Sequence, residues 1–282
     1  MNKPTERLHY LQSVKNGMRI LRLFSSERPE LRITEIANLL GMSKSSVSRL
    51  VNILVQEEFL EQSSTSSRYR PGISLFTLSG VITNNLEIHR EALPVLKKLV
   101  RDVNETAHIS VLEDTNIVYL HKVECKHPVR LESFVGVPNP AFCTSSGKVM
   151  LSFRSPREVE RVIEAGLPKL GPGSVTDPGV FRRQMTAIRK AGYAVCIEEL
   201  HEGVTSIGAP ILDYTEEVVA AVSIAGPTIR INDDSIPNMV KHVIAAGAVI
   251  SSQLGYTGRL FQHWLAEGKP WSSTVQNPET PL

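Results

Sequence analysis

Apolar positions at the start of the chain recur with the spacing of helices. The segment 13–24 carries an apolar stripe behind Ser13, whose hydroxyl suits a helix N-cap, and the proline-containing segment 28–30 ends it. A second stripe follows in 31–40 and stops at Gly41, because glycine adopts the left-handed conformation that closes a helix without a steric penalty. The pattern therefore predicts two helices with a short break between them.

A third helix is predicted from Ser43, its N-cap, to about Glu58. Its buried face would carry Val47, Leu50, Val51 and Leu54. Two helices joined by a short turn that begins with glycine indicate a helix-turn-helix. The side chains left facing outward are hydroxyls, cations and an amide, which suit phosphates and base edges in a major groove: Lys44, Ser45, Ser46, Ser48, Arg49 and Asn52. A solvated face on a small helical bundle is the alternative.

The segment 59–72 reads as a strand, a polar tip and a second strand. Its tip contains only serine and threonine, and Arg68 and Arg70 lie on one face of the second strand with Tyr69 on the other. A hairpin directly after a helix-turn-helix is a wing, and these arginines could reach phosphates or the minor groove. An ordinary surface hairpin is the alternative.

The rest of the chain alternates between helical and strand periods. Helices are predicted over 73–91 and 93–104, the second with Pro94 in its first turn. Period-two stretches begin near His108, and strands are predicted at 109–112, 117–120, 129–134, 193–197, 206–212 and 218–225. Further helices are predicted at 149–153, 157–165, 181–191 and 237–254. Strands grouped around a few helices indicate an α+β fold with an antiparallel sheet.

Composition and charge narrow the class. The 282 residues are 41% hydrophobic and 21% charged, which is typical of a soluble globular protein of one or two domains. No apolar run approaches the roughly 18 residues of a membrane span, and the N-terminus lacks the apolar core of a signal peptide, so we expect a cytoplasmic protein with no membrane partner. The net charge of +2 is uneven, since residues 1–72 hold eleven Lys/Arg against seven Asp/Glu. A basic head on a slightly acidic body favours nucleic-acid binding by the head.

Catalytic and metal-binding motifs are incomplete. The three cysteines form no CxxC pair and the histidines no HExxH spacing, so neither a metal nor another cofactor is expected. The segment 145–148 satisfies S-x-x-K without the companion motifs of serine acyl-enzymes. Glu198 and Glu199, adjacent on a predicted strand, would point to opposite faces and could not act as a dyad. We therefore expect no catalytic residues.

Three stretches together resemble a known family. Residues 33–37, 41–50 and 68–72 look like the winged helix-turn-helix of IclR-type bacterial transcriptional regulators, and the pattern continues to about Tyr256. The resemblance implies a winged helix-turn-helix in 1–72, a linker helix in 73–91, a GAF-like effector-binding domain in 92–257, and a partly disordered tail in 258–282. It also implies double-stranded operator DNA as a partner, a homodimer or a dimer of dimers, and a DNA contact at Thr34.

The resemblance further implies a pocket for a small molecule in the second domain. The segment 144–148 looks like a turn and helix start that line it, and a helix N-terminus is a natural seat for a carboxylate. A simple helix cap is the alternative. The implied effector-binding residues are Leu131, Val137, Phe142, Thr144, Ser145, Ser146, Cys196, Ser206, Ser223 and Ala225.

Several of these positions depart from the family pattern. Cys196 stands where an acidic residue is frequent, Ser206 where cysteine is, Ala225 where serine is, and Phe142 where histidine is common. Losing a carboxylate favours an anionic ligand, and an aromatic wall favours a ring. We therefore expect a small organic acid as the effector, with an aromatic acid as the narrower form of this expectation. The alternative class is a metabolite-binding protein or enzyme that uses its N-terminal unit only for assembly.

The C-terminal tail carries two tryptophans. A short helix is expected over 258–265, and the proline-rich segment 269–282 is expected to be disordered. Docking of Trp264 and Trp271 on a neighbouring subunit is the alternative.

Overall fold

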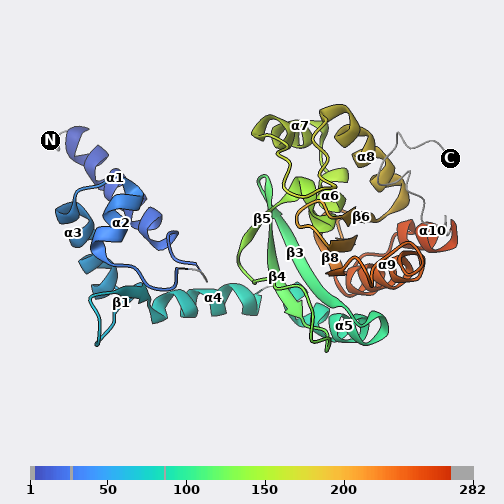
Figure 1. Cartoon of the computed structure of the whole chain (residues 1–282), viewed down its shortest axis with the longest axis horizontal. Helices are drawn as coiled ribbons and strands as arrows, with labels where there is room; N and C mark the ends of the chain where they lie inside the picture. Colours follow the sequence, from blue (N-terminus) through green and yellow to red (C-terminus); the bar gives the residue numbers. More distant parts are fainter. Residues whose placement is uncertain (1–3, 26–27, 86, 268–282) are drawn as a thin grey trace. The chain divides into compact units, whose positions relative to one another are not determined.

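The computed structural model describes residues 4–25, 28–85 and 87–267, and the chain divides into two compact units (Figure 1). Unit 1 is Met1–Leu86 and unit 2 is Glu87–Leu282. Among the described residues, no helix combines the length and the apolarity needed to span a membrane. The fold is α+β, as the sequence predicts.

Unit 1 is a three-helix group followed by a two-stranded hairpin and a fourth helix. Its elements are α1 (Pro4–Leu21), α2 (Ile33–Leu40), α3 (Lys44–Gln56), β1 (Leu60–Gln62), β2 (Tyr69–Pro71) and α4 (Ile73–Asn85). Its core is a cluster of buried apolar side chains contributed by the three helices and the hairpin: Ile20, Leu31, Ile36, Ala37, Val47, Val51, Leu60 and Tyr69.

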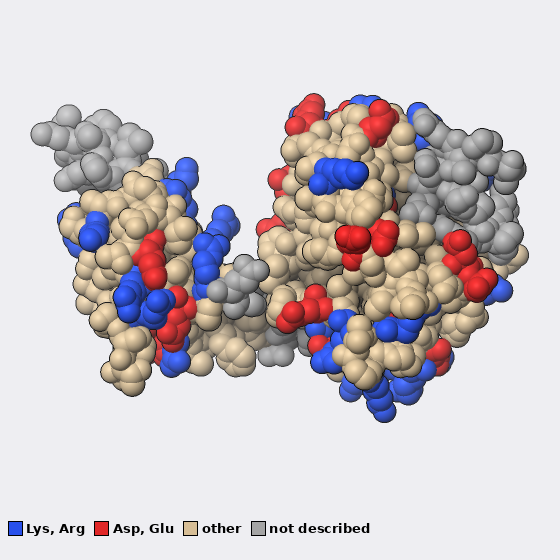
Figure 2. Space-filling model, in the orientation of Figure 1, with Lys and Arg blue, Asp and Glu red and all other residues tan. Residues whose placement is uncertain are grey.

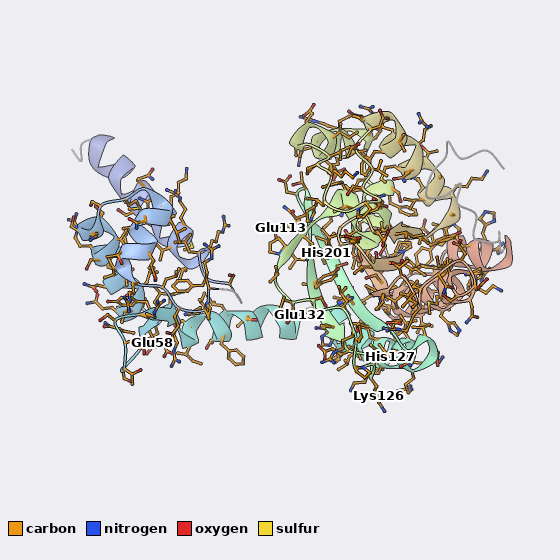
Figure 3. The ribbon with its side chains drawn as sticks, in the orientation of Figure 1. Glu58, Glu113, Lys126, His127, Glu132 and His201 are labelled. Carbon is orange, nitrogen blue, oxygen red and sulfur yellow. The ribbon has the colours of Figure 1, made fainter. Side chains whose placement is uncertain are left out.

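The turn between α2 and α3 has the predicted geometry. Gly41 has φ of 63°, and its N–H donates to the carbonyl oxygens of Ala37 and Asn38. Ser43 caps α3, since its side chain accepts a hydrogen bond from the N–H of Ser46 at 3.2 Å. The helix-turn-helix is confirmed. Helix α3 ends slightly earlier than predicted, because Glu58 (labelled in Figure 3) already has a φ of 59°.

Two helix boundaries in the first hundred residues were predicted wrongly. Helix α1 begins at Pro4, so Ser13 lies inside it and is not its cap; proline is well suited to a first helical position, and serine is tolerated within a helix. Helix α4 ends at Asn85, and α5 (Glu87–Val103) contains Pro94 in its interior. One continuous apolar stripe, from Ile88 through Ala92, Leu96 and Leu99 to Val103, is buried along the length of this helix. Its burial outweighs the cost of the proline on the exposed side.

Unit 2 is built on a six-stranded antiparallel sheet in the order β5-β4-β3-β8-β7-β6 (Figure 1). The strands are β3 (Thr106–Glu113), β4 (Asn116–Val123), β5 (Pro138–Pro140), β6 (Ala194–Ile197), β7 (Val204–Leu212) and β8 (Val218–Pro227). Helices α5 and α9 (Ile236–Gln253) pack on one face. The short η1 (Ala141–Cys143), α6 (Ser145–Ser152), α7 (Pro156–Ala165) and α8 (Pro178–Ala191) gather on the other.

The two faces of the sheet differ in polarity because residues alternate along each strand. The face toward α9 carries apolar residues such as Ala209, which lies against Gly247 of α9. Gly208, the preceding residue, faces α6 and pairs with Ser223, which in turn pairs with His108. The α6 face therefore holds buried polar side chains in the middle of the domain, where a binding site would need them.

The predicted strand at 129–134 is wrong, and β5 was not predicted. The backbone of this segment is held by side chains instead of a strand partner: Lys122 Nζ donates to the carbonyl of Ser133 at 2.7 Å, and Arg230 Nη2 donates to that of Val129 at 3.1 Å. Val129 and Phe134 are exposed, so the alternating pattern did not mark a buried face.

The short helix expected near the C-terminus is present as α10 (Leu260–Glu267). Trp264 is only 7% exposed within its own chain, where it packs edge-on against Phe153 and Phe261. It is therefore not available for docking on a neighbouring subunit. Trp271 and the segment 269–282 lie outside the described residues.

Candidate functional sites

The first candidate site is the outward surface of α2 and α3 in unit 1. Thr34, Lys44, Ser45, Arg49 and Asn52 are exposed, while Ser46 and Ser48 are partly buried. Ser43 Oγ also contacts the hydroxyls of Ser45 (3.1 Å) and Ser46 (2.9 Å), so these serines form a connected polar cluster at the start of α3. Among the described residues, neither Lys44 nor Arg49 forms an ion pair.

The two wing arginines have partners within unit 1. Arg68 forms an ion pair with Glu35 of α2 at 3.3 Å and donates to the carbonyl of Glu30 at 3.1 Å. Arg70 pairs across the hairpin with Glu61. Basic and acidic side chains are interleaved on the face of unit 1 visible in Figure 2. Phosphates would therefore compete with carboxylates for these arginines, whereas Lys44 and Arg49 have no such competitor among the residues described.

The second candidate site is a cavity between the sheet of unit 2 and α6. Its volume is about 40 Å³. Its wall is formed by residues from β4, β6, β7, β8, the α6 N-terminus and two connections: Tyr119, Leu131, Cys143, Thr144, Ser145, Ser146, Cys196, Glu199, Leu200, His201, Val204, Ser206, Ser223 and Ala225. His201, labelled in Figure 3, belongs to the connection between β6 and β7.

The first turn of α6 supplies hydrogen-bond donors to this cavity. Thr144 caps the helix by accepting from the N–H of Gly147 at 3.2 Å. The backbone N–H groups of Ser145 and Ser146 have no acceptor among the described residues. Gly208 lets β7 approach closely, because a Cβ there would lie 3.0 Å from Ser146 N. The arrangement combines free amides, hydroxyls and the positive end of the helix dipole, which together favour an anion.

A buried ion pair lies beside this turn. Lys148 Nζ is 2.6 Å from each carboxylate oxygen of Glu199 and 2.9 Å from Gln184 Oε1, and both charged side chains are at most 1% exposed. Burial alone would lower the pKa of Lys148, but the Glu199 carboxylate more than offsets it and leaves that pKa above its ordinary value. Burial, followed by the same carboxylate, raises the pKa of Cys143 to about 12, so this thiol stays protonated.

A buried histidine lies behind the aromatic wall of the cavity. The ring of His108 stacks on that of Tyr119 with 4.3 Å between centroids, and His108 Nε2 is 2.7 Å from Ser133 Oγ. Burial, with a smaller contribution from Lys122, lowers the pKa of His108 to about 3. The imidazole is therefore neutral, and it links Tyr119 to the connection that carries Leu131.

The cavity brings together most of the predicted effector-binding residues. Leu131, Thr144, Ser145, Ser146, Cys196, Ser206, Ser223 and Ala225 all line it. Val137 and Phe142 do not: Val137 is 38% exposed, and Phe142 is buried in η1 at 4% exposure. The aromatic wall is Tyr119 instead of Phe142.

Sequence reasoning missed the residues that follow β6. Glu198 and Glu199 are not on a strand, because β6 ends at Ile197 and Glu198 has a φ of 53°. Glu199 therefore joins the cavity lining, and its side chain is fully buried in the ion pair with Lys148. Lys148 is the lysine of the S-x-x-K pattern noted in the sequence. Its pairing with Glu199 could not be predicted from the sequence. No cluster of three or more potential metal ligands occurs within the described ranges.

Comparison with known proteins identifies the family to which the chain belongs. The model for the helix-turn-helix domain of IclR matches residues 13–64, and the model for the C-terminal domain of the bacterial transcriptional regulator IclR matches residues 81–252. The second match covers more than half of the chain. The protein therefore belongs to the IclR family of DNA-binding transcriptional regulators.

Individual relatives agree with this assignment. The chain is 32% identical to the HTH-type transcriptional regulator KipR of Bacillus subtilis over 87% of its length and 98% of KipR. It resembles the crystal structure of an IclR-type regulator from Silicibacter sp. TM1040 with a TM-score of 0.78 at 26% identity, covering 88% of this chain and 98% of that one. An IclR homologue from Microbacterium hydrocarbonoxydans, solved in complex with 4-hydroxybenzoate, gives a TM-score of 0.77 at 26% identity, with coverage of 86% and 98%.

Proposed function

We propose that a small organic acid, bound in the cavity of unit 2, modulates the affinity of unit 1 for operator DNA. The observation that carries this proposal is the first turn of α6, whose free amides and hydroxyls open into a buried cavity. The Microbacterium relative, similar in fold, was solved with an aromatic acid. An aromatic acid also suits Tyr119 in the wall of this cavity. We propose no catalytic role.

We further propose which residues contact operator DNA. The set consists of exposed or partly exposed groups on α2, α3 and the wing: Thr34, Lys44, Ser45, Ser46, Ser48, Arg49, Asn52, Arg68 and Arg70. Lys44 and Arg49 would make the main charged contacts, since they lie near the N-terminus of the recognition helix and have no competing carboxylate among the residues described. Arg68 would act mainly by fixing the wing against α2 through Glu35.

We also propose that the protein is a cytoplasmic homodimer or dimer of dimers. Helix α4 contains no charged residue, and four of its apolar side chains are 49–76% exposed: Ile73, Phe76, Leu78 and Val81. An uncharged apolar helix at the surface of one chain is stabilised when a second copy covers it. Two copies of unit 1 could then read the two halves of a symmetric operator.

The decisive experiment is a gel shift with the DNA upstream of the gene, at low salt, with and without a panel of organic acids. We expect a shifted band whose midpoint changes when the correct acid is added. Absence of any shift would leave unit 1 with only an assembly role, which is the alternative class. Titration calorimetry against the same panel tests the cavity separately, and binding of only cations or sugars would contradict an acid effector.

A further inference from the structure

Basic side chains form an exposed row along helix α5 of unit 2. Arg90, Lys97 and Arg101 are all exposed. Together with the exposed Pro94 they follow the spacing of three and four residues that aligns side chains on one face of a helix. Asn104, directly after α5, continues this spacing, so the row is about 20 Å long at about 1.5 Å per residue. None of its positions carries an acidic residue.

The row continues into the connection between β4 and β5. The side-chain amide of Asn104 lies 2.9 Å from His127 Nε2, and the N–H of Cys125 donates to Thr106 Oγ1 at 3.3 Å. These two contacts hold the connection against the residues that follow α5, and they place the exposed Lys126 at that end of the row. Lys126 and His127 lie together at the lower edge of unit 2 in Figure 3, where Figure 2 shows Lys and Arg side chains gathered.

Four cations thus make up a basic ridge: Arg90, Lys97, Arg101 and Lys126. Arg90 forms an ion pair with Glu91, whereas the other three form none among the residues that the structure describes. The neighbouring acidic side chains already have basic partners: Asp102 with Lys98, Glu105 with Arg230, and Glu124 with Lys122. Unit 2 as a whole holds twenty Lys/Arg against twenty-two Asp/Glu, so the ridge is a local excess of positive charge on a slightly acidic unit.

The chemistry of the ridge suits a nucleic-acid backbone better than a protein surface. Protein interfaces are anchored by aromatic and large apolar side chains, and the ridge presents no exposed Trp, Tyr, Phe, Leu or Ile. A DNA duplex carries one negative charge per about 1.7 Å of its axis. A straight row of cations can neutralise several phosphates along such a duplex without reading its sequence.

The position of α5 in the chain brings a duplex to the ridge. Helix α5 begins at Glu87, directly after unit 1 ends at Leu86. A duplex held by unit 1 therefore presents its flanking base pairs to unit 2 at a high effective concentration. Under these conditions, phosphate contacts that are too weak to hold free DNA still add to the affinity for a long duplex.

We propose that the basic ridge is a second DNA contact of this protein and binds the phosphate backbone of the duplex that flanks the operator. This inference rests on the proposed function, since unit 1 must first hold the operator. It extends the contact with DNA from unit 1 to unit 2, and it makes the affinity depend on the length of the duplex as well as on its sequence.

The test compares two duplexes with the full-length protein. The short one is the shortest fragment that keeps sequence-specific binding at high salt, and the long one adds about 30 base pairs of unrelated sequence on each side. Affinities are measured by fluorescence anisotropy at several salt concentrations. We expect the wild-type protein to bind the long duplex about tenfold more tightly at low salt, with a slope of log K against log salt that is steeper by two to three units.

The variant that removes the ridge is Lys97→Ala/Arg101→Ala/Lys126→Ala. All three side chains are exposed, and alanine is favourable within a helix, so the fold should tolerate it. It should bind the long duplex within about twofold of the short one, and its affinity for the short duplex should equal that of the wild type.

The matched control variant is Arg157→Ala/Lys169→Ala/Lys190→Ala. It removes the same charge from exposed positions on α7, on α8 and between them, and these helices cover the other face of the sheet. The control variant should keep the preference of the wild type for the long duplex.

The outcomes separate this inference from the function on which it rests. A wild-type protein that binds both duplexes equally well contradicts the ridge as a DNA contact and leaves operator binding by unit 1 intact. A preference for the long duplex that survives removal of the ridge, or that the control variant loses to the same extent, also contradicts it. Failure to bind the short duplex at any salt concentration contradicts the proposed function itself.

Discussion

Single residues set the geometry of the turn and of the helix start that lead into α3. Gly41 and Ser43 were predictable from the sequence because left-handed φ and N-capping are local properties of neighbouring residues. The pairing of Arg68 with Glu35 was not, since it joins side chains that are 33 positions apart and depends on how the wing folds back. The structure thus separates Lys44 and Arg49, which lack ion-pair partners among the described residues, from arginines that already have one.

Lys44→Ala and Arg49→Ala should each weaken operator binding and lower the slope of log K against log salt by about one unit, because each would remove one of the proposed phosphate contacts. Arg68→Ala should lower the slope less and reduce thermal stability more, since it breaks the tie to Glu35. Gel shifts at several salt concentrations measure the slopes. Lys169→Ala, an exposed lysine of unit 2, is the control. Equal salt slopes for all four variants would contradict the distinction between Lys44 and Arg49, as DNA contacts, and Arg68, as a residue that fixes the wing.

His108 gives the stability of the protein a specific pH dependence. With a folded pKa of about 3 and an ordinary value of 6.5, the folded state resists a proton that the unfolded chain accepts. The stabilisation is complete above pH 6.5 and is lost as the pH falls toward 3, at about 1.4 kcal/mol per pH unit. Urea unfolding at pH 6.5 and pH 5 should therefore differ by about 2 kcal/mol from this residue.

The matched variant for His108 is His108→Gln, which keeps a polar group near Ser133 but does not titrate. In this variant the free energy of unfolding should change little between pH 6.5 and 5. The loss of stability at lower pH, which protonation of carboxylates causes, should persist. If stability falls between pH 6.5 and 5 as steeply in this variant as in the wild type, another group is responsible for the pH dependence.

Helices and strands were predicted best where their own residues determine them. The hairpin of β3 and β4 and the strands β6 to β8 follow from alternation and turn residues. The break between α4 and α5 was predicted too late in the chain because Pro94 signals a helix start, whereas burial of the whole apolar stripe depends on the packing of α5 against the sheet and α9. The strand at 129–134 was predicted because alternation cannot show whether a neighbouring strand exists.

The contact between β7 and α6 fixes the first turn of α6 in the cavity. A Cβ at Gly208 would lie 2.9 Å from the carbonyl carbon of Ser145, and this neighbour is backbone that cannot rotate away. Gly208→Ala should therefore destabilise the protein by about 1–3 kcal/mol, as overpacking does. It should also weaken binding of an acid, because it displaces the amides of Ser145 and Ser146.

Thermal unfolding and calorimetry measure the two effects of Gly208→Ala. Gly17→Ala is the control, since a Cβ at that position in α1 meets nothing within 4 Å and alanine favours a helix. Normal acid binding by a destabilised Gly208→Ala protein would show that the first turn of α6 does not hold the ligand.

At the scale of the whole molecule, the apolar helix α4 determines the expected assembly. Phe76→Glu places a charge at a side chain that is 76% exposed in a single chain, so a monomer should tolerate it while a dimer should not. Analytical ultracentrifugation should show a halved mass and the gel shift a loss of operator affinity. Ile229→Glu, at an exposed apolar residue of unit 2, should change neither the mass nor the operator affinity. An unchanged mass for Phe76→Glu would place the interface elsewhere.

The helix α10 lies beyond the part of the chain that the family models cover, which ends at residue 252. Its Trp264 lies so close to Gly192 that a Cβ at position 192 would fall 2.1 Å from the indole ring. The residues at positions 192 and 264 are therefore expected to vary together among relatives. A side chain at position 192 would leave no room for the indole of a tryptophan at position 264. Such a relative would need to reposition its C-terminal helix. For protein engineering, a fusion or label is better attached after Glu267 than directly after α9. Attachment after Glu267 keeps α10 in the chain, so that the indole of Trp264 still packs against Gly192.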